Sequence, residues 1–494
     1  MNPTLSLARK RKPKGAFSAH LPDDTHITLG LVLGIFVLVL LGAFGSGGGR
    51  VMVGVQAALT MIVTIICGVL DWRRHQRLTL VMTFAGIYTF VYAARALAIS
   101  LTDDFAIFYS VFLLSPTWTD LSNTMCATGM GFVMLMLGAM VLDNKAAKIS
   151  RESLTTWKAK FSGVLRCGLI PRLTMLGIQV GSLFLIYRIA DPNQKLSLTD
   201  LSDSAYIYLG PTLVHGSNLF ITILFLIRAI RFKAPEDFLM AGISIAIDLV
   251  CAYLMVNLST FRSFFLAGLL LIVVSLLYSF RGRLNPLLLV FLFLIYPYFK
   301  YVGGDRSLTG SELVAKLVDD PLEAYSGDSL ANAFGPGTDL NMFDTFLASL
   351  QWDHRWRPYV LSVAYVAVHW VPRSLWPGKP LQGNLADTGY TYGVPYSPGI
   401  IGFFNDDGGV AYMLVMMAAV GLFLRYLDIR VYQIKDGVLQ SCVFACVFFG
   451  TLVLVRSFAF QAVWGVAAFM APLLILYWIF GRKAAPAKRV VARI

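Results

Sequence analysis

Two cations stand in a stiff, aromatic stretch of the chain, "HWVPRSLWPGKP" at residues 369–380. Its three prolines restrict the backbone, so Arg373 and Lys379 have little conformational freedom to lose on binding. The guanidinium group of an arginine binds phosphate oxygens through paired hydrogen bonds, and the ammonium group of a lysine adds a point charge. A tryptophan such as Trp376 favours the headgroup level of a membrane. The stretch therefore predicts a site for a lipid phosphate. The alternative is a lipid-anchoring loop whose cations reach out to the headgroups.

Three further arginines lie at the ends of apolar runs. They are Arg262 in "STFRSFFLAG", Arg456 in "LVLVRSFAF" and Arg95 in "YAARALAI". The topology given below places all three on the same side as the 369–380 stretch, where they would add positive charge to one anion site. Ordinary snorkelling of each arginine towards the headgroups is the alternative.

Candidate general bases flank a short apolar segment at 358–371. The adjacent Asp353 and His354 are preferred to His369, because a histidine beside a carboxylate is well suited to take a proton from a hydroxyl near neutral pH. His215 is a weaker candidate, and packing is the alternative for each histidine. The sequence contains no metal-binding or nucleotide-binding motif, so neither a metal nor another cofactor is expected.

The run "SPGIIGFFNDDGGVAYMLV" leads into an apolar segment near residue 409. Gly408 and Gly409 allow close backbone approach, and a helix N-terminus facing outwards suits an anion or a sugar. The alternative is a plain loop-to-helix junction capped by Asp406 or Asp407.

Asp248 falls near the middle of the apolar run "ISIAIDLVCAY". An ionisable group at that depth costs ~2.5–3.5 kcal/mol on insertion scales, so we expect it to have a partner. The interpretations left open are a buried pair with an arginine, a protonated and hydrogen-bonded carboxyl, and a proton relay in a transporter.

The composition identifies the elements that must position these residues. With 57% hydrophobic residues, 14% charged residues and a mean hydropathy of +0.68, the 494-residue chain is predicted to be an integral membrane protein. The net charge of +13 does not indicate nucleic-acid binding, because the cations are spread over short connections between apolar runs. We predict an all-α polytopic fold of about twelve membrane-spanning helices with one large loop that contains short helices.

Charge sets the expected topology. With the N-terminus inside, the inner connections hold 28 of the 41 lysines and arginines. The predicted division is a basic cytoplasmic N-terminus (1–26), spans one to nine (27–301), a large periplasmic loop (302–408), spans ten to twelve (409–480) and a basic cytoplasmic C-terminus (481–494). The segment 358–371 is too short to span and is predicted to be a helix at the outer surface.

Together these features resemble the Wzy-type oligosaccharide repeat-unit polymerases, the family of O-antigen and exopolysaccharide polymerases. The resemblance rests on the span count, the late large loop, "STFRSFFLAG", "VPRSLWPGKP" and "FFNDDGGVAYML". It covers residues 240–425 by motif and the rest by topology. Asn405 and Asp406 are then glycan-binding candidates, although Asn405-Asp406-Asp407-Gly408 departs from the family's usual Asn-Phe-Gly.

The resemblance implies a GT-C-like, metal-independent glycosyltransferase in the bacterial inner membrane. Its donor and acceptor would be undecaprenyl-diphosphate-linked repeat units, and its partners the lipid bilayer, a chain-length regulator and a flippase. If 358–371 is a helix, Arg357 and Arg373 lie roughly 24 Å apart, so we expect separate stations for the two lipid carriers, with Arg355 and Arg357 at one of them. The alternatives are an O-antigen ligase and a flippase or proton-coupled transporter for lipid-linked sugars.

Overall fold

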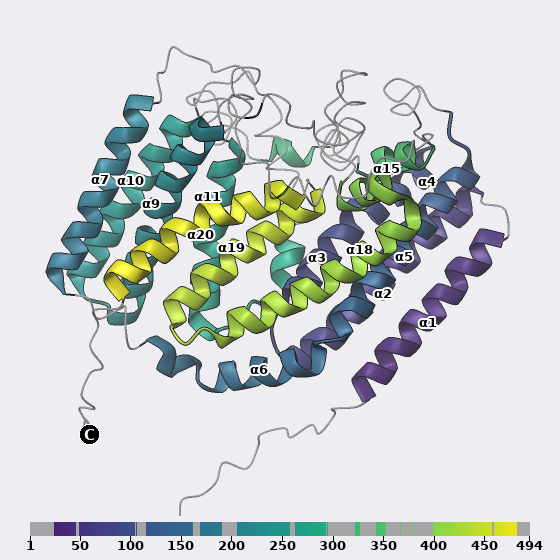
Figure 1. The fold of residues 1–494 in the computed structure, drawn as a ribbon, viewed down its shortest axis with the longest axis horizontal. Helices are drawn as coiled ribbons and strands as arrows, with labels where there is room; N and C mark the ends of the chain where they lie inside the picture. The colour runs from purple at the N-terminus through teal and green to yellow at the C-terminus, as the bar shows by residue number, and fades with distance from the viewer. Residues whose placement is uncertain are drawn as a thin grey trace, which may run out of the picture.

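The computed structural model describes most of the apolar part of the chain. The described residues are 24–45, 49–103, 105, 115–161, 168–189, 205–256, 262–292, 294, 322–326, 342–351, 366, 376, 399–456 and 459–481. Every regular element within them is helical (Figure 1). The helices are α1 (Asp24–Gly45), α2 (Arg50–His75), α3 (Leu80–Thr89), the π-helical turn η1 (Phe90–Ala94), α4 (Arg95–Thr102), α5 (Trp118–Met140), α6 (Asp143–Thr155), η3 (Trp157–Phe161), α7 (Leu169–Ile189), α9 (Ala205–Phe232), α10 (Pro235–Val256), α11 (Arg262–Arg281), η5 (Glu323–Tyr325), α15 (Met342–Gln351), α18 (Gly399–Gln433), α19 (Gly437–Arg456) and α20 (Ala459–Gly481).

The predicted all-α polytopic fold class is confirmed. Nine helical segments among the described residues are long and apolar enough to cross a membrane. The predicted spans at 237–256 and 264–280 also coincide with helices, α10 and α11. The ninth predicted span, 285–301, is described only to residue 294. The count of twelve and the GT-C-like arrangement stay predictions.

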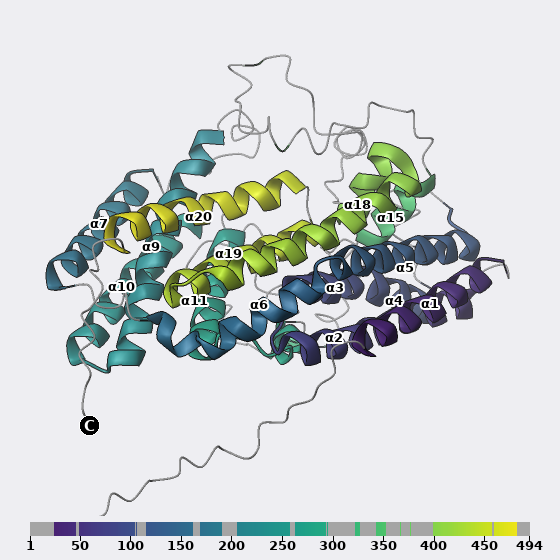
Figure 2. The same cartoon turned by 60° about the horizontal axis from the view of Figure 1, so that its bottom comes forward.

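The helices form two groups joined by the last three helices of the chain. Figures 1 and 2 show α1 to α5 gathered at one end of the molecule and α7, α9 and α10 at the other. Between them, α18 contacts α5, α6 and α15, α19 contacts α11, and α20 contacts α9. The short helix α6 lies across the lower side of the bundle in Figure 1, whereas α15 lies on the upper side. We call these two sides the α6 face and the α15 face.

Close packing of α5 against α18 fixes the core on the N-terminal side. A side chain at Gly138 would collide with the carbonyl group of Ala418, and one at Gly421 would collide with that of Leu135. Small residues that let two backbones touch are typical of helix pairs in membranes, where van der Waals packing replaces much of the hydrophobic driving force. This contact positions α18, which carries residues of both sites described below.

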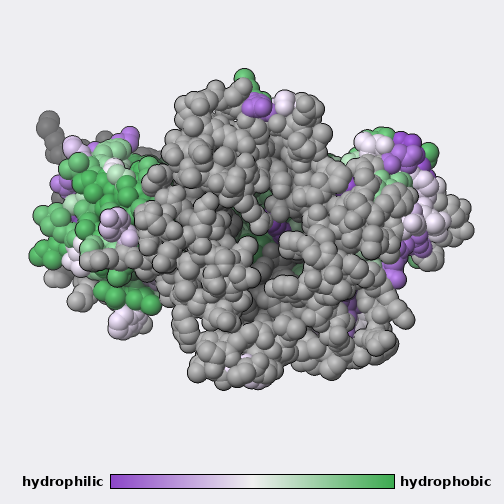
Figure 3. Space-filling model, turned by 90° about the horizontal axis from the view of Figure 1, so that it is seen from above, coloured by the Kyte–Doolittle hydropathy of each residue, from purple (hydrophilic) through white to green (hydrophobic). Residues whose placement is uncertain are grey.

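Apolar side chains cover the outer surfaces of the bundle. On α1, Leu31, Ile35 and Leu38 are exposed, and on α7 so are Leu173 and Phe184. Figure 3, which views the α15 face, shows apolar side chains gathered at the flank where α7 stands in Figure 1. Large exposed apolar surfaces of this kind are expected where helices meet lipid.

Two elements differ from the sequence prediction. The predicted span 78–99 is interrupted by the π-helical turn η1, directly before Arg95. Helix α18 begins at Gly399, inside the predicted loop 302–408, and is kinked at Gly408 and Gly409. The apolar run that predicted a start near 409 therefore covers only the second part of this helix.

Candidate functional site

Helix α15 is a piece of the predicted large loop that packs into the bundle. It contacts α18, α5 and η1. Its side chains Met342, Phe343 and Phe346 are buried, and the Phe346 ring lies edge-on to Tyr92 with ring centres 6.3 Å apart. An amphipathic helix this short gains most of its stability from such packing. The packing therefore fixes α15 itself at a defined place on the α15 face.

A buried ion pair joins α15 to the end of the interrupted helix. Arg95 Nε donates to Asp344 Oδ2 at 3.0 Å, and both side chains are buried. The π-helical turn before Arg95 adds a residue to the helical turn and changes the direction in which later side chains point, a feature frequent at functional sites. Arg95 Nη2 has no hydrogen-bond partner among the residues that the structure describes.

A second polar contact joins α15 to α18. Asn405 Nδ2 donates to Ser349 Oγ at 3.1 Å, and Asn405 is buried. Ser349 also interacts with Asp406, which stands beside Asp407. The predicted glycan-binding residues Asn405 and Asp406 thus lie against α15.

Helix α18 is broken where these polar residues end. Gly409 has φ 74° and ψ −177°, a conformation that is essentially restricted to glycine. At the first residue, Gly399, φ is 64°, and a side chain there would collide with Tyr92, Val455 and Met342. Broken helices in membrane proteins point partial charges at bound ions or substrates. We call Arg95, Asp344, Ser349, Asn405 and Asp406 the α15 site.

The predicted catalytic residues adjoin this site in the chain. Asp353 and His354 follow the last residue of α15, Gln351, by two and three positions. They lie outside the described residues, as do five further predicted site residues of the loop. Those residues are His369, Arg373, Lys379, Arg355 and Arg357.

The remaining predicted residues are placed in part. Arg262 begins α11, but the structure does not describe its side chain. Arg456 ends α19, is exposed, and follows Val455, whose carbonyl oxygen lies against Gly399 of the α15 face. Trp376 is exposed.

One contact joins Val366 to the bundle. Trp464 Nε1 of α20 donates to the carbonyl oxygen of Val366 at 3.0 Å. The last helix of the bundle therefore contacts the chain three residues before His369 in the sequence.

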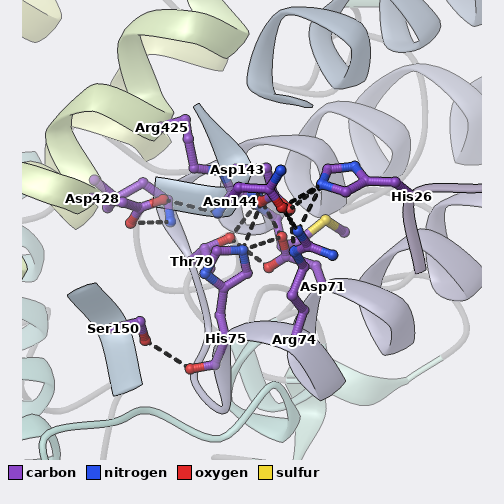
Figure 4. Close-up of polar contacts among 12 residues, drawn as sticks. His26, Asp71, Arg74, His75, Thr79, Asp143, Asn144, Ser150, Arg425 and Asp428 are labelled. Atoms are coloured by element: carbon purple, nitrogen blue, oxygen red, sulfur yellow. Dashed lines mark hydrogen bonds and ion pairs between the residues drawn. The ribbon is translucent and has the colours of Figure 1, made fainter. Parts of the chain in front are cut away.

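A denser set of charges lies on the α6 face (Figure 4). His75 Nε2 and Asp143 Oδ1 are 2.7 Å apart, and Arg74 Nε lies 2.5 Å from Asp143 Oδ2. Arg425 Nη2 lies 2.5 Å from Asp71 Oδ1 and 3.1 Å from Asp143 Oδ1. All five side chains are buried. They come from α2, α6 and α18, so the ion pairs fasten three helices together.

The network continues to the start of α3. Arg425 Nη1 lies 3.4 Å from Asp428 Oδ2, and Asp428 Oδ1 accepts from the backbone N–H of Leu80 at 3.1 Å. Thr79 donates to Asp71 Oδ2 at 2.8 Å, and its hydroxyl also accepts from the N–H of Met82 as the N-cap of α3. We call the six charged residues the α6 cluster. They are Asp71, Arg74, His75, Asp143, Arg425 and Asp428.

The α6 cluster has the residue types of a metal site but is occupied by guanidinium groups. Ligand atoms of Asp71, His75 and Asp143 lie within 4.8 Å of one another. Arg425 Nη2 already contacts both carboxylates, and a divalent cation placed between them would face two arginines. Like charges at this distance repel strongly in a buried setting. The arrangement therefore fits an ion-pair network better than a metal centre.

The arginines also set the protonation state of Asp143, which stands at the start of α6, outside the spanning segments. Burial alone would raise the pKa of its carboxyl. Arg425, His75 and Arg74 outweigh burial and hold this pKa well below its usual range. Asp143 is consequently ionised at any physiological pH.

Sequence reasoning identified Arg95, Asn405 and Asp406 of the α15 site, but it missed Asp344, Ser349 and every residue of the α6 cluster. For Asp344, the available signal is a single acid in the otherwise apolar run "NMFDTFLASL". For the α6 cluster, it is acid–base spacing on a helix, with Asp71 and His75 four apart and Arg425 and Asp428 three apart. Neither signal tells which distant helix supplies the partner.

No known protein family, curated protein or solved structure matches this chain.

Proposed function

We propose that the chain is a bacterial inner-membrane glycosyltransferase that polymerises lipid-diphosphate-linked oligosaccharide repeat units at its α15 face. The observation that carries the proposal is the docking of α15 into the bundle. A loop helix held by the buried Arg95–Asp344 pair stands between a π-helical turn and a broken helix. The cations of the proline-bracketed motif at 372–380 and the resemblance to the polymerase family indicate that the reaction is glycosyl transfer from a lipid diphosphate.

The reaction forms one glycosidic bond and breaks one sugar-phosphate bond. A hydroxyl of the acceptor repeat attacks the anomeric carbon of the donor chain, its proton passes to a base, and the lipid diphosphate leaves with the electron pair of the broken bond. Asp353 and His354, directly after α15, are the preferred base and its orienting partner, with His369 the alternative. Anchoring α15 at Asp344 and Ser349 restricts how far these residues can move, which favours reactive geometry.

The leaving diphosphate needs positive charge. Arg373 and Lys379, supported by Arg262 and Arg456, stabilise that charge as it develops. Arg355 and Arg357 form the second station, which holds the carrier of the other repeat. Trp376 anchors the motif at the membrane surface.

The test is polymerisation by the purified full-length protein in lipid nanodiscs with a lipid-diphosphate-linked repeat unit. We expect a ladder of products, retained in EDTA, and a loss of at least 100-fold in rate for Arg373→Ala. Arg430→Ala on the α6 face, exposed at the end of α18, is the matched control and should retain the wild-type rate. A ladder that needs added divalent metal, or equal loss in both variants, contradicts the proposal.

Products in cells separate this function from its alternatives. Without a polymerase, single repeats accumulate on the carrier at the outer surface. Without a ligase, long carrier-bound polymer accumulates instead. Without a flippase, the repeats stay on the inner side of the membrane.

A further inference from the structure

A buried cluster of polar side chains lies between α7, α9 and α10, at the opposite end of the bundle from α15. Asp248 of α10 is 6% exposed, and neither of its oxygens has a hydrogen-bond partner among the described residues. The same holds for Oδ1 of Asn218, a fully buried residue of α9. Two unsatisfied acceptors inside a helical bundle are costly, since each lacks the compensation that water would give.

The Thr222 hydroxyl interacts with the Asp248 carboxyl, but its single proton has other acceptors nearby. Gln179 Nε2 donates to Thr222 Oγ1 at 3.1 Å, and Ser244 Oγ donates to Gln179 Oε1 at 2.9 Å. The Thr222 proton is then shared between Ser244 Oγ at 2.8 Å, the carbonyl oxygen of Ser244 at 3.5 Å and the Asp248 carboxyl. Gln179 Nε2 also donates to the carbonyl oxygen of Asn218 at 3.2 Å, so these three side chains offer Asp248 at most one proton.

The other neighbours of Asp248 follow the same pattern. Thr222 and Cys251 are the groups that interact with its carboxyl. Asn218 directs its amide nitrogen to Cys251 Sγ at 3.4 Å, which leaves its oxygen as the group without a partner. The cluster therefore brings together carboxylate, amide and hydroxyl oxygens with few protons to share among them.

Charge balance selects the class of ligand. No arginine or lysine among the described residues forms an ion pair with Asp248. The arginines of the same helices, Arg172 and Arg228, are paired with Asp237 at 2.9 and 3.1 Å instead. A single carboxylate is neutralised by one positive charge, whereas a divalent ion would leave a net charge buried. Oxygen ligands suit hard cations.

We propose that Asp248, Asn218 and Thr222 form a binding site for one monovalent cation, Na⁺ or H⁺, within the bundle. His215, one and two turns from these residues on α9, and Cys251 are the titratable side chains nearest to it along the helices. This site is separate from the α15 site, and it makes the chain able to sense or move a cation independently of glycan chemistry.

The test uses the purified full-length protein in nanodiscs without any glycan. Binding of radioactive Na⁺ is measured by scintillation proximity, and the carbonyl stretch of a protonated carboxyl by infrared difference spectroscopy. We expect either saturable Na⁺ binding or a protonated-carboxyl band at neutral pH, and Asp248→Asn should abolish whichever is seen. The first result identifies a sodium site and the second a proton site.

Two variants keep the outcome interpretable. Asp103→Asn removes an exposed acid that pairs with Arg50 and should change neither signal. If Asp248→Asn fails to fold, Asn218→Ala is used in its place. Loss of one neutral ligand should weaken Na⁺ binding about tenfold, or shift the pH at which the carboxyl band disappears. Wild-type protein with neither signal, or signals that survive in Asp248→Asn, would overturn the proposal.

Discussion

The α6 cluster and the α15 site are both buried, charged and shared between distant helices, yet they are built differently. In the α6 cluster three carboxylates face two guanidinium groups and a histidine, and Arg425 alone contacts three acids. In the α15 site one ion pair stands beside a broken helix, and an arginine nitrogen has no partner among the described residues. Nitrogen atoms without a partner among the described residues occur in both sites, since Arg425 Nε and His75 Nδ1 of the α6 cluster share this property with Arg95 Nη2. The difference lies in the charges and the backbone. Several ion pairs fasten three helices in the α6 cluster, which serves the fold, whereas the α15 site adjoins a strained break in a helix, which is expected where a substrate binds.

The largest expected effect is in the α6 cluster. Arg425→Met leaves Asp71, Asp143 and Asp428 without their shared cation, and breaking a buried pair in this way costs about 3–5 kcal/mol. Thermal unfolding in detergent, followed by fluorescence-detected gel filtration, measures the loss. Arg430→Met, an exposed arginine of the same helix that packs on Tyr426, should stay within about 0.5 kcal/mol of wild type.

The coupling within each site should differ as well. A double-mutant cycle of Arg95→Met and Asp344→Leu should give a coupling energy of about 2 kcal/mol, because it removes the one buried ion pair that joins these two residues. The same cycle for Arg425→Met and Asp71→Leu should not isolate a pairwise energy, since Asp143 and Asp428 also lose a partner in every variant that lacks Arg425. Equal, pairwise coupling in the two cycles would contradict the distinction drawn between the sites.

Helix α18 allows a comparison between its two strained glycines. Gly399→Ala meets both a positive φ and a collision with Tyr92, so the free energy of unfolding should fall by about 3 kcal/mol. At Gly409 the space around the new methyl group is open and only the backbone penalty remains, about 1–2 kcal/mol. Chemical denaturation of both variants measures which substitution lowers the free energy of unfolding more. A larger decrease for Gly409→Ala than for Gly399→Ala would contradict the open surroundings described for Gly409.

The smallest effect is the response to acid. The folded pKa of Asp143 lies below its unfolded value of about 3.9, so its contribution is present in full above that pH and is lost as the pH falls through the folded pKa. Unfolding measured between pH 6 and 3 should show stability falling at the acid end. Asp143→Asn should flatten the dependence of the unfolding free energy on pH while lowering stability at neutral pH. An unchanged dependence would show that Asp143 does not cause the loss of stability in acid.

How far the sequence predicted the molecule depends on the range of the interaction. Apolar runs predicted the helices because the length needed to cross a membrane is a local property, and eleven of the predicted spans coincide with helices. The break in α18 was signalled by Gly408 and Gly409, but its earlier start at Gly399 was not. The nine-residue piece before the break is held by Tyr92, Met342 and Val455, which stand far away in the sequence.

The sites were predicted less completely for the same reason. Asn405 was a candidate through the family resemblance of the run around it, and the structure brings it against Ser349. Asp344 and Asp143 acquire their roles only through Arg95 and Arg425, hundreds of residues away. No spacing rule specifies such partners in a single sequence.

The most direct test compares Arg95→Lys with Arg425→Lys in the full-length protein. Each variant keeps the positive charge but loses the planar guanidinium group, which can donate two parallel hydrogen bonds to one carboxylate or phosphate. Polymerisation rate per folded molecule and melting temperature are measured side by side. We predict that Arg95→Lys loses at least tenfold in rate with a melting temperature near that of wild type, whereas Arg425→Lys melts earlier but polymerises normally once folded. The opposite pattern would contradict the assignment of chemistry to the α15 face and of stability to the α6 face.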